Sequence, residues 1–228
     1  AEANLTAIFN REGHEIVGHY TYALCGDGDL MEGASHEAAS LAGHLRLDKL
    51  IWVYDDNHIS IEGDTSLTYS DDLAKRFDAY HWHVQNLGDK ANDLTALEIA
   101  LSKAKEEKER PSLIMVRSHI CYGSPNRQNT KEAHGEPLGE EEIRLTKRFY
   151  GWPENEKFVV PEQVLNHMRQ AIERGKKLEE NWNVKFGEYK KAFPEMAKRF
   201  EEALSGDIPH GWDNEIPNFG PTDGPMAT

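Results

Sequence analysis

Gly-Asp-Gly-Asp-Leu-Met-Glu-Gly (26–33) is the stretch that decides the fold, because it separates a predicted strand from a predicted helix. The stretch follows an apolar, β-favouring run that ends at Cys25, and apolar side chains then recur at three- and four-residue spacing over residues 30–47. A second apolar run, residues 49–54, ends at the triplet Asp55-Asp56-Asn57. A strand, a turn, a helix and a strand make a βαβ unit, which places both polar segments at one edge of a parallel sheet.

The same alternation of patterns continues along the chain. It predicts a helix over 72–80, a strand over 82–87, a helix over 92–108 and a strand over 112–117. Ser70 or Asp71 is expected to cap the first of these helices. A long loop over 119–139, rich in Gly and Pro, and a helix over 140–149 follow. The sequence therefore predicts an α/β fold, a mainly parallel sheet with helices on both faces.

The last third of the chain has a different character. Charged helical patterns cover residues 161–204, with a break at Pro194, and Pro and Gly are frequent from residue 205 onward. We therefore expect three parts: an α/β domain over 1–150, a helical extension packed on it over 151–204, and a linker over 205–228.

Composition excludes some partners. The 228 residues include 40 acidic and 26 basic side chains, a formal charge of −14 that disfavours binding to nucleic acid or to an anionic membrane. Two cysteines without CxxC spacing indicate a reducing compartment. No apolar run is long enough to span a bilayer and no secretory signal opens the chain, so a cytoplasmic location is expected. The chain begins without methionine and ends in a loop-like stretch, so we expect a processed chain or a piece of a longer one.

The polar segments at the predicted sheet edge suit a divalent ion. Asp27 offers a carboxylate, Asn57 a carboxamide oxygen and Ile59 a backbone carbonyl, and Mg²⁺ or Ca²⁺ prefers such oxygen ligands. Gly28 and the residues that enter the helix offer backbone N–H groups to a diphosphate. Gly-Asp-Gly alone is ordinary turn chemistry, and the asparagine after the next strand is what strengthens the prediction.

Further motifs make the sequence resemble the transketolases, a family of thiamine-diphosphate enzymes. They extend through nearly the whole chain: Gly-Asp-Gly-x-Leu-Met-Glu-Gly (26–33), Ser-Leu-Ala-Gly-His-Leu (40–45), Tyr-Asp-Asp-Asn-x-Ile-x-Ile (54–61), Tyr-Gly-Ser-Pro-Asn (122–126), His-Gly-Glu-Pro-Leu-Gly (134–139) and Gly-Trp (151–152). The resemblance implies the thiamine-diphosphate-binding fold, with residues 1–150 as the diphosphate-binding domain. It also implies thiamine diphosphate and Mg²⁺ (or Ca²⁺) as cofactors.

The resemblance also implies a role for individual residues near the turn. Asp27, Asn57 and the carbonyl of Ile59 would bind the metal ion that bridges to the diphosphate. Gly28 would contact the diphosphate, as Asn57 does through the ion, and Ile61 would pack against the thiazolium ring.

Three more residues acquire roles from the resemblance. His134 would contact the diphosphate and the substrate, which gives it both a cofactor-binding and a catalytic role. Glu32 and Glu37 would face the partner subunit of a homodimer and help to position a glutamate there, which gives Glu32 a catalytic role. The implied activity is transfer of a two-carbon ketol unit from a ketose phosphate to an aldose phosphate, in the pentose phosphate pathway. Because the family has an upstream segment and a following domain that these residues lack, we expect residues 1–228 alone to be inactive.

Other interpretations of the same residues stay open. A related enzyme, such as dihydroxyacetone synthase or deoxyxylulose-phosphate synthase, would share these motifs, and a non-catalytic phosphate- or nucleotide-binding module could share the fold. His134 could be an ordinary loop histidine, and Glu32 and Glu37 plain helix acids. The aromatic side chains of residues 182–193 are expected to form core rather than a cofactor site.

Overall fold

The computed structural model describes residues 1–208, 210–218, 220 and 224. The chain divides into two compact units. One holds residues 19–166 together with Glu2, and the other holds residues 3–18 and those from 167 onward, together with Ala1. Each unit has its own core, and each is described by itself.

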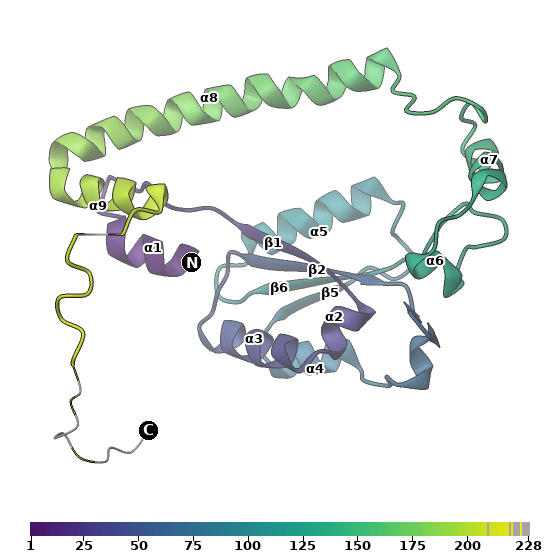
Figure 1. Cartoon of the computed structure of the whole chain (residues 1–228), viewed down its shortest axis with the longest axis horizontal. Coiled ribbons are helices and arrows are strands. Elements are labelled where there is room, and N and C mark those ends of the chain that lie inside the picture. The colour runs from purple at the N-terminus through teal and green to yellow at the C-terminus, as the bar shows by residue number, and fades with distance from the viewer. Residues whose placement is uncertain (209, 219, 221–223, 225–228) are drawn as a thin grey trace. The chain divides into compact units, whose positions relative to one another are not determined.

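The larger unit alternates strands and helices along the chain (Figure 1). Its elements are β1 (Thr21–Gly26), α2 (Asp27–Met31), α3 (Gly33–His44), β2 (Leu50–Asp56), β3 (Ile59–Ser60), β4 (Gly63–Asp64), the 3₁₀ helix η1 (Thr65–Leu67), α4 (Leu73–Ala79), β5 (His83–Asn86), α5 (Leu94–Glu106), β6 (Ser112–Arg117), α6 (Glu132–Gly135) and α7 (Glu140–Phe149). All four strands of the predicted sheet are present, and β6 has the predicted bounds.

The main sheet has the order β1-β2-β6-β5, and every pair of neighbours is parallel. Gly26 lies opposite Asp55 across the first pair, and Asp56 lies opposite Arg117 across the second. The carboxyl ends of three strands therefore meet at one edge, as the sequence predicts for the polar segments.

Helices cover both faces of this sheet, which confirms the predicted α/β fold. On one face, residues of β2 and β6 pack with α2, α3, α4 and the buried Trp82, whose Nε1 donates to the carbonyl of Ala39 at 2.8 Å. On the other face, Ile51, Ile114 and Val116 pack against α5. Figure 1 shows α5 on one side of the strands and α3 and α4 on the other.

The predicted helix over 30–47 is wrong in detail, because the chain forms two helices there. The first, α2, begins at Asp27, where the Asp29 carboxylate accepts a hydrogen bond from the backbone N–H of Gly26 at 2.8 Å. Glu32 has extended backbone angles (φ −68°, ψ 136°) and separates α2 from α3. Because Glu32 interrupts the helix, α2 and α3 can point in different directions, and the direction of α3 does not determine the position of Asp27 at the sheet edge.

The predicted cap of α4 is also corrected. The N-cap is Asp72, whose Oδ1 accepts from the backbone N–H of Lys75 at 3.1 Å. Asp71, one residue earlier, instead pairs with Arg76 at 2.7 Å. Of these two consecutive aspartates, Asp72 caps the helix and Asp71 forms an ion pair with a side chain of the same helix.

The long loop before α7 is an ordered structure. The carboxylate of Glu142, in the first turn of α7, accepts hydrogen bonds from the hydroxyl of Ser124 and from the backbone and side-chain N–H groups of Asn126, the last two at 2.8 Å. Gly123 has φ +85° and lies against Phe149, so any side chain there would collide with the ring. Within the loop, residues 132–135 form the short helix α6, which the sequence did not predict.

The smaller unit is built mainly from α1 (Glu2–Phe9), α8 (Glu162–Ala192) and α9 (Pro194–Ser205). Trp182, Phe186 and Tyr189 on α8 pack with Phe9 and Phe200, which confirms the expectation that the aromatic stripe is core. The hydroxyl of Tyr189 donates to the carbonyl of Phe9 at 2.7 Å.

Pro194 is the first residue of α9, as the predicted helix break requires. Of the predicted linker, residues 209, 219, 221–223 and 225–228 lie outside the described residues. Within the part of the chain that the structure describes, no helix combines the length and the apolar character needed to cross a membrane.

Candidate functional site

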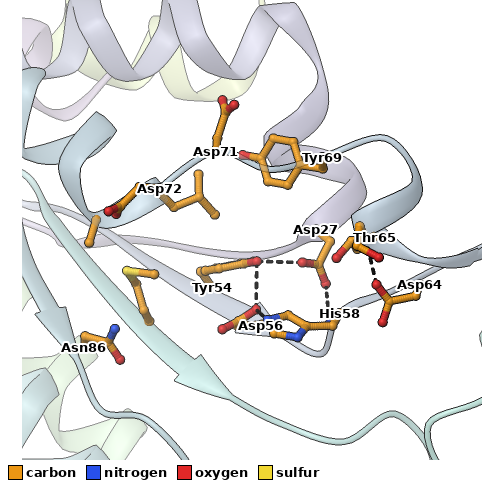
Figure 2. Close-up of a pocket in the computed structure, with 14 residues that line it drawn as sticks. Asp27, Tyr54, Asp56, His58, Asp64, Thr65, Tyr69, Asp71, Asp72 and Asn86 are labelled. Carbon is orange, nitrogen blue, oxygen red and sulfur yellow. Dashed lines mark hydrogen bonds and ion pairs between the residues drawn. The ribbon is translucent and has the colours of Figure 1, made fainter.

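Asp27 is a buried carboxylate at the junction of β1 and α2. It is the first residue of α2 and only 3% exposed. The hydroxyl of Tyr54 donates to its Oδ1 at 2.6 Å, and the backbone N–H of His58 donates to its Oδ2 at 3.1 Å (Figure 2). The carboxylate therefore joins the turn after β1 to the end of β2 and to the loop that follows β2.

A second carboxylate lies beside the first. Asp56, the last residue of β2, accepts from the Tyr54 hydroxyl at 3.1 Å and pairs with Nε2 of His58 at 3.0 Å. His58 has φ +61°, a left-handed conformation that turns its backbone N–H toward Asp27. Figure 2 shows Asp27, Asp56 and His58 grouped around the Tyr54 hydroxyl.

The electrostatics of this group favour a cation. Burial raises the pKa of Asp27, and the neighbouring charge of Asp56 raises that pKa further, while the hydrogen bonds from Tyr54 and His58 lower it. Burial is also the main cause that raises the pKa of Tyr54, followed by its hydrogen bond with Asp27. A cation placed beside Asp27 would relieve both the burial cost and the repulsion between the two carboxylates.

Asn57 and Ile59 lie in the same loop, next to His58. Oδ1 of Asn57 accepts from the backbone N–H of Ile59 at 2.9 Å, and Nδ2 donates to Asp55 at 3.2 Å. Ile59 begins β3 and is half-buried opposite Asp64 of β4. The hydrogen bond from His58 to Asp27 brings this loop to the turn that carries Asp27, so the three predicted metal ligands lie in two adjoining segments.

Gly28 and Ile61 are open to solvent. A Cβ built on Gly28 meets no atom within 4 Å, so the turn leaves free space above its backbone. Ile61, in the turn between β3 and β4, is 71% exposed. Both positions are therefore accessible to a ligand, one through its backbone and the other through an apolar side chain.

The remaining predicted residues lie outside this group of contacts. Glu32 is exposed between α2 and α3, and Glu37 is exposed on α3. His134 is exposed in α6, and within the described residues no hydrogen bond joins its ring to Asp27 or Asn57. Their predicted roles stay predictions.

A cavity of about 370 Å³ opens beside Asp27. Its walls come from the start of α2, the end of β2, the segment from β4 to α4, the end of β5, and Met115 within β6. The acidic and aromatic groups among them are Asp27, Tyr54, Asp56, Asp64, Tyr69, Asp71 and Asp72 (Figure 2). The hydroxyl of Tyr69 is buried and has no hydrogen-bond partner within the described residues. The cavity is accordingly polar and negatively charged on the side of the two strand ends.

The residues present fit a divalent ion and a diphosphate. Asp27 is a buried carboxylate that a cation would stabilise, and Asn57 and Ile59 add the neutral oxygens that such ions accept. Gly28 leaves the space that a phosphate needs to reach backbone N–H groups. No described residues group three or more His, Cys, Asp or Glu side chains as a metal site.

Sequence reasoning missed Tyr54, Asp56 and His58 as members of this group. Tyr54 and Asp56 lie on either side of Asp55, and the alternation of side chains along a strand would put the side chains of Tyr54 and Asp56 on the same face of the sheet. That signal was available in the sequence. The conformation of His58 was not, since a positive φ at a non-glycine residue cannot be deduced from composition.

Comparison with known proteins identifies the family. Residues 1–209 match the family model described as "Transketolase, thiamine diphosphate binding domain". The chain belongs to the transketolase family. A transketolase from Nostoc sp. (strain PCC 7120) is 48% identical over 228 residues, which cover 100% of this chain and 34% of the relative. The chain thus spans about a third of the length of the curated transketolases it matches.

Solved structures of the transketolase family have the same fold. Transketolase from Leishmania mexicana superposes with a TM-score of 0.90 and 40% identity, over 96% of this chain and 32% of that one. A Pichia stipitis transketolase in complex with sedoheptulose 7-phosphate superposes with a TM-score of 0.89 and 36% identity, over 98% of this chain and 33% of that one. The resemblance to the transketolases and the predicted thiamine-diphosphate-binding fold are confirmed.

Proposed function

We propose that this chain provides the diphosphate- and metal-binding part of a transketolase, which transfers a two-carbon ketol unit from a ketose phosphate to an aldose phosphate. The observation that carries the proposal is the buried Asp27, held at the strand edge by Tyr54 and His58 beside the open backbone of Gly28. The family match and the sugar-phosphate complex of the Pichia stipitis relative support the reaction and the substrate class.

In this proposal the thiamine diphosphate supplies the carbon–carbon chemistry, and the protein supplies binding and orientation. Asp27, Asn57 and the carbonyl of Ile59 hold Mg²⁺ or Ca²⁺, and Gly28 admits the diphosphate to the backbone. Ile61 gives the thiazolium ring an apolar surface. These residues lie in two segments, the turn after β1 and the loop after β2. The hydrogen bond from the backbone N–H of His58 to Asp27 joins the two segments.

Other parts of the proposal concern residues outside that group. His134 contacts the diphosphate and the substrate from the loop that Glu142 anchors. Glu32 and Glu37 face a second copy of the protein in a homodimer, where Glu32 acts on the reaction through the partner's side of the site. The exposed positions of all three leave them free for such contacts. The two free cysteines agree with a reducing, cytoplasmic location, and sugar-phosphate substrates agree with a place in the pentose phosphate pathway.

Calorimetry on the protein that carries this chain, at its natural length, tests the proposal. Asp27→Ala should weaken Mg²⁺-dependent binding of thiamine diphosphate by about a hundredfold or more, because the ion loses its one carboxylate ligand. Asp78→Ala is the matched control, since Asp78 is exposed on α4 and its loss should leave binding unchanged. Equal affinity in the Asp27→Ala variant and the wild type would refute the assignment.

An assay of donors and acceptors separates the related enzymes. The relatives named above are transketolases, which favours sugar phosphates on both sides of the reaction over the substrates of a dihydroxyacetone synthase or a deoxyxylulose-phosphate synthase. We expect ketol transfer to be faster with a sugar-phosphate donor and a sugar-phosphate acceptor than with any other donor–acceptor pair tested. Cofactor binding without transfer to any acceptor would favour the non-catalytic binding module.

A further inference from the structure

The side-chain amide of Asn57 is held in one orientation by two hydrogen bonds with opposite requirements. The Asp55 carboxylate, 3.2 Å from Nδ2, can only accept a hydrogen bond, so it must face the NH₂ end of the amide. The backbone N–H of Ile59, 2.9 Å from Oδ1, can only donate, so it must face the oxygen end. A flipped amide would lose both bonds, and the two ends are therefore chemically determined.

Asp55 is itself fixed by the neighbouring strand. The hydroxyl of Ser118, just beyond β6, donates to Oδ1 of Asp55. The backbone N–H of Ser118 donates to the carbonyl of Asp56 at 3.1 Å, and Nη1 of Arg117 donates to the same carbonyl at 2.7 Å. These contacts join the carboxyl ends of β2 and β6, so the Asp55 carboxylate is held by a sheet edge and not by a mobile loop.

We propose that Asp55 is a positioning residue that presents the oxygen of Asn57, and not its NH₂ group, to the divalent ion, and that Ser118 holds Asp55 in the place where it can do so. The inference rests on the proposed function, because it takes Asn57 as a ligand of the ion. The physical need is clear: an amide oxygen has lone pairs for a metal ion, whereas the NH₂ group has only hydrogens to offer. Outer partners that orient a ligand in this way commonly change metal affinity by about 10–100-fold when they are removed.

Two substitutions at Asp55 separate orientation from simple loss of charge. Asp55→Ala removes the acceptor and should weaken Mg²⁺-dependent binding of thiamine diphosphate by about tenfold or more. Asp55→Asn removes the same charge but keeps an oxygen that can accept from Nδ2 of Asn57, so it should retain most of the affinity. Glu62→Ala, which removes an exposed acidic residue from the turn between β3 and β4, is the control for charge and should bind as the wild type does.

A double-mutant cycle with Asn57→Ala tests whether Asp55 acts through Asn57. If it does, Asp55→Ala should have little further effect on metal-dependent binding once the Asn57 side chain is gone. Equal effects of Asp55→Ala in the presence and absence of the Asn57 side chain would overturn the proposal. So would an affinity of Asp55→Ala equal to that of the wild type.

The orientation has a second readout that needs no metal or cofactor. In an NMR spectrum of protein with ¹⁵N-labelled asparagine, the side-chain NH₂ signals of Asn57 should be well separated and protected from exchange. Asp55→Ala and Ser118→Ala should both reduce that separation and protection, and Ser118→Ala serves if Asp55→Ala does not fold. Unchanged signals in Ser118→Ala, or in a folded Asp55→Ala, would overturn the inference.

The two readouts also separate failure of this inference from failure of the proposed function. A wild-type protein that binds no metal–diphosphate complex refutes the proposed function and with it the metal-presenting role of Asp55. A wild-type protein that binds the complex, together with an Asp55→Ala variant that binds it equally well, refutes only the role of Asp55.

Discussion

The hydroxyl of Tyr54 lies 2.6 Å from Oδ1 of Asp27 and is the nearest hydrogen-bond donor to that buried carboxylate. The same hydroxyl lies 3.1 Å from Oδ1 of Asp56. A phenol has one proton to donate, so it cannot satisfy both carboxylates fully. The arrangement keeps two acids close together at the strand edge and leaves unbalanced negative charge there, which a divalent ion would neutralise.

Tyr54→Phe should therefore raise the pKa of Asp27 further, since the hydrogen bond from Tyr54 lowers that pKa. It should also destabilise the fold by about 2 kcal/mol, a typical contribution of a hydrogen bond to a charged group. The Asp27 carboxyl signal in an NMR titration and urea unfolding measure the two effects. Tyr22→Phe is the control because Tyr22 is 50% exposed on β1. A titration of Asp27 that is the same in Tyr54→Phe and the wild type would contradict the prediction.

Two glycines should respond in opposite ways to replacement by alanine. A Cβ on Gly43 would lie 1.7 Å from the carbonyl oxygen of Tyr80, so Gly43→Ala must separate α3 from the turn after α4 and should cost about 2 kcal/mol or more. A Cβ on Gly28 meets nothing within 4 Å, and alanine favours a helix over glycine by up to about 1 kcal/mol, so Gly28→Ala should keep or raise stability.

The two variants should rank in the opposite order for cofactor binding: Gly28→Ala, the more stable variant, should bind the cofactor more weakly. If the diphosphate reaches the backbone at Gly28, the added methyl group occupies its space, and Gly28→Ala should bind thiamine diphosphate more weakly than a folded Gly43→Ala protein does. Thermal unfolding with and without the cofactor and Mg²⁺ measures both properties in one series. Full cofactor binding by Gly28→Ala would remove this residue from the predicted site.

The sequence predicted the sheet and its polar edge well because both follow from local patterns. Buried parallel strands read as continuous apolar runs, and β6 was predicted with the bounds that the structure has. The break at Glu32 was missed because the apolar residues of the sequence, such as Met31, Ala34 and Ala38, continue at three- and four-residue spacing across it. Contacts between distant segments, such as that from Glu142 to Ser124 and Asn126, have no local signature and could not be predicted.

Arg76 makes further contacts between distant segments that could not be predicted from local sequence. These contacts support the turn that carries Asp27. Its guanidinium donates to the carbonyl of Leu30 at the end of α2 (3.0 Å) and to Asp71 (2.7 Å), and it lies 3.2 Å from Nε2 of His36 on α3. Arg76→Met keeps the length of the apolar stem but leaves these groups without the cation. It should destabilise the fold by about 2 kcal/mol, as the loss of a hydrogen bond to a charged group does.

Arg76→Lys is the informative comparison. Lysine keeps the charge but cannot reach several acceptors from one planar group, so it should recover only part of the lost stability. Urea unfolding of the two variants beside Arg169→Met, a change at an exposed position of α8, measures the difference. Wild-type stability in Arg76→Met would show that α2 and α4 are held together by their apolar contacts alone.

Glu142 should give the long loop a stability that depends on pH. The hydrogen bond from Ser124, followed by those from Asn126, lowers the pKa of Glu142 below its ordinary value of 4.5. A carboxyl group with a lowered folded pKa stabilises the folded loop above the ordinary value, and that stability is lost as the pH falls through the folded pKa. Protection of the Asn126 backbone N–H from hydrogen exchange should therefore be high at neutral pH and fall in acid.

Glu142→Gln removes the titrating group and should make this protection low and nearly independent of pH, because a neutral amide accepts the three hydrogen bonds less strongly. Glu141→Gln, an exposed neighbour that pairs with Arg144 on the surface, should leave the wild-type profile intact. Because His134 lies in the same loop, the Glu142 variant should also show lower protection around α6. A wild-type exchange profile in Glu142→Gln would mean that the packing of Gly123 against Phe149 orders the loop without the carboxylate.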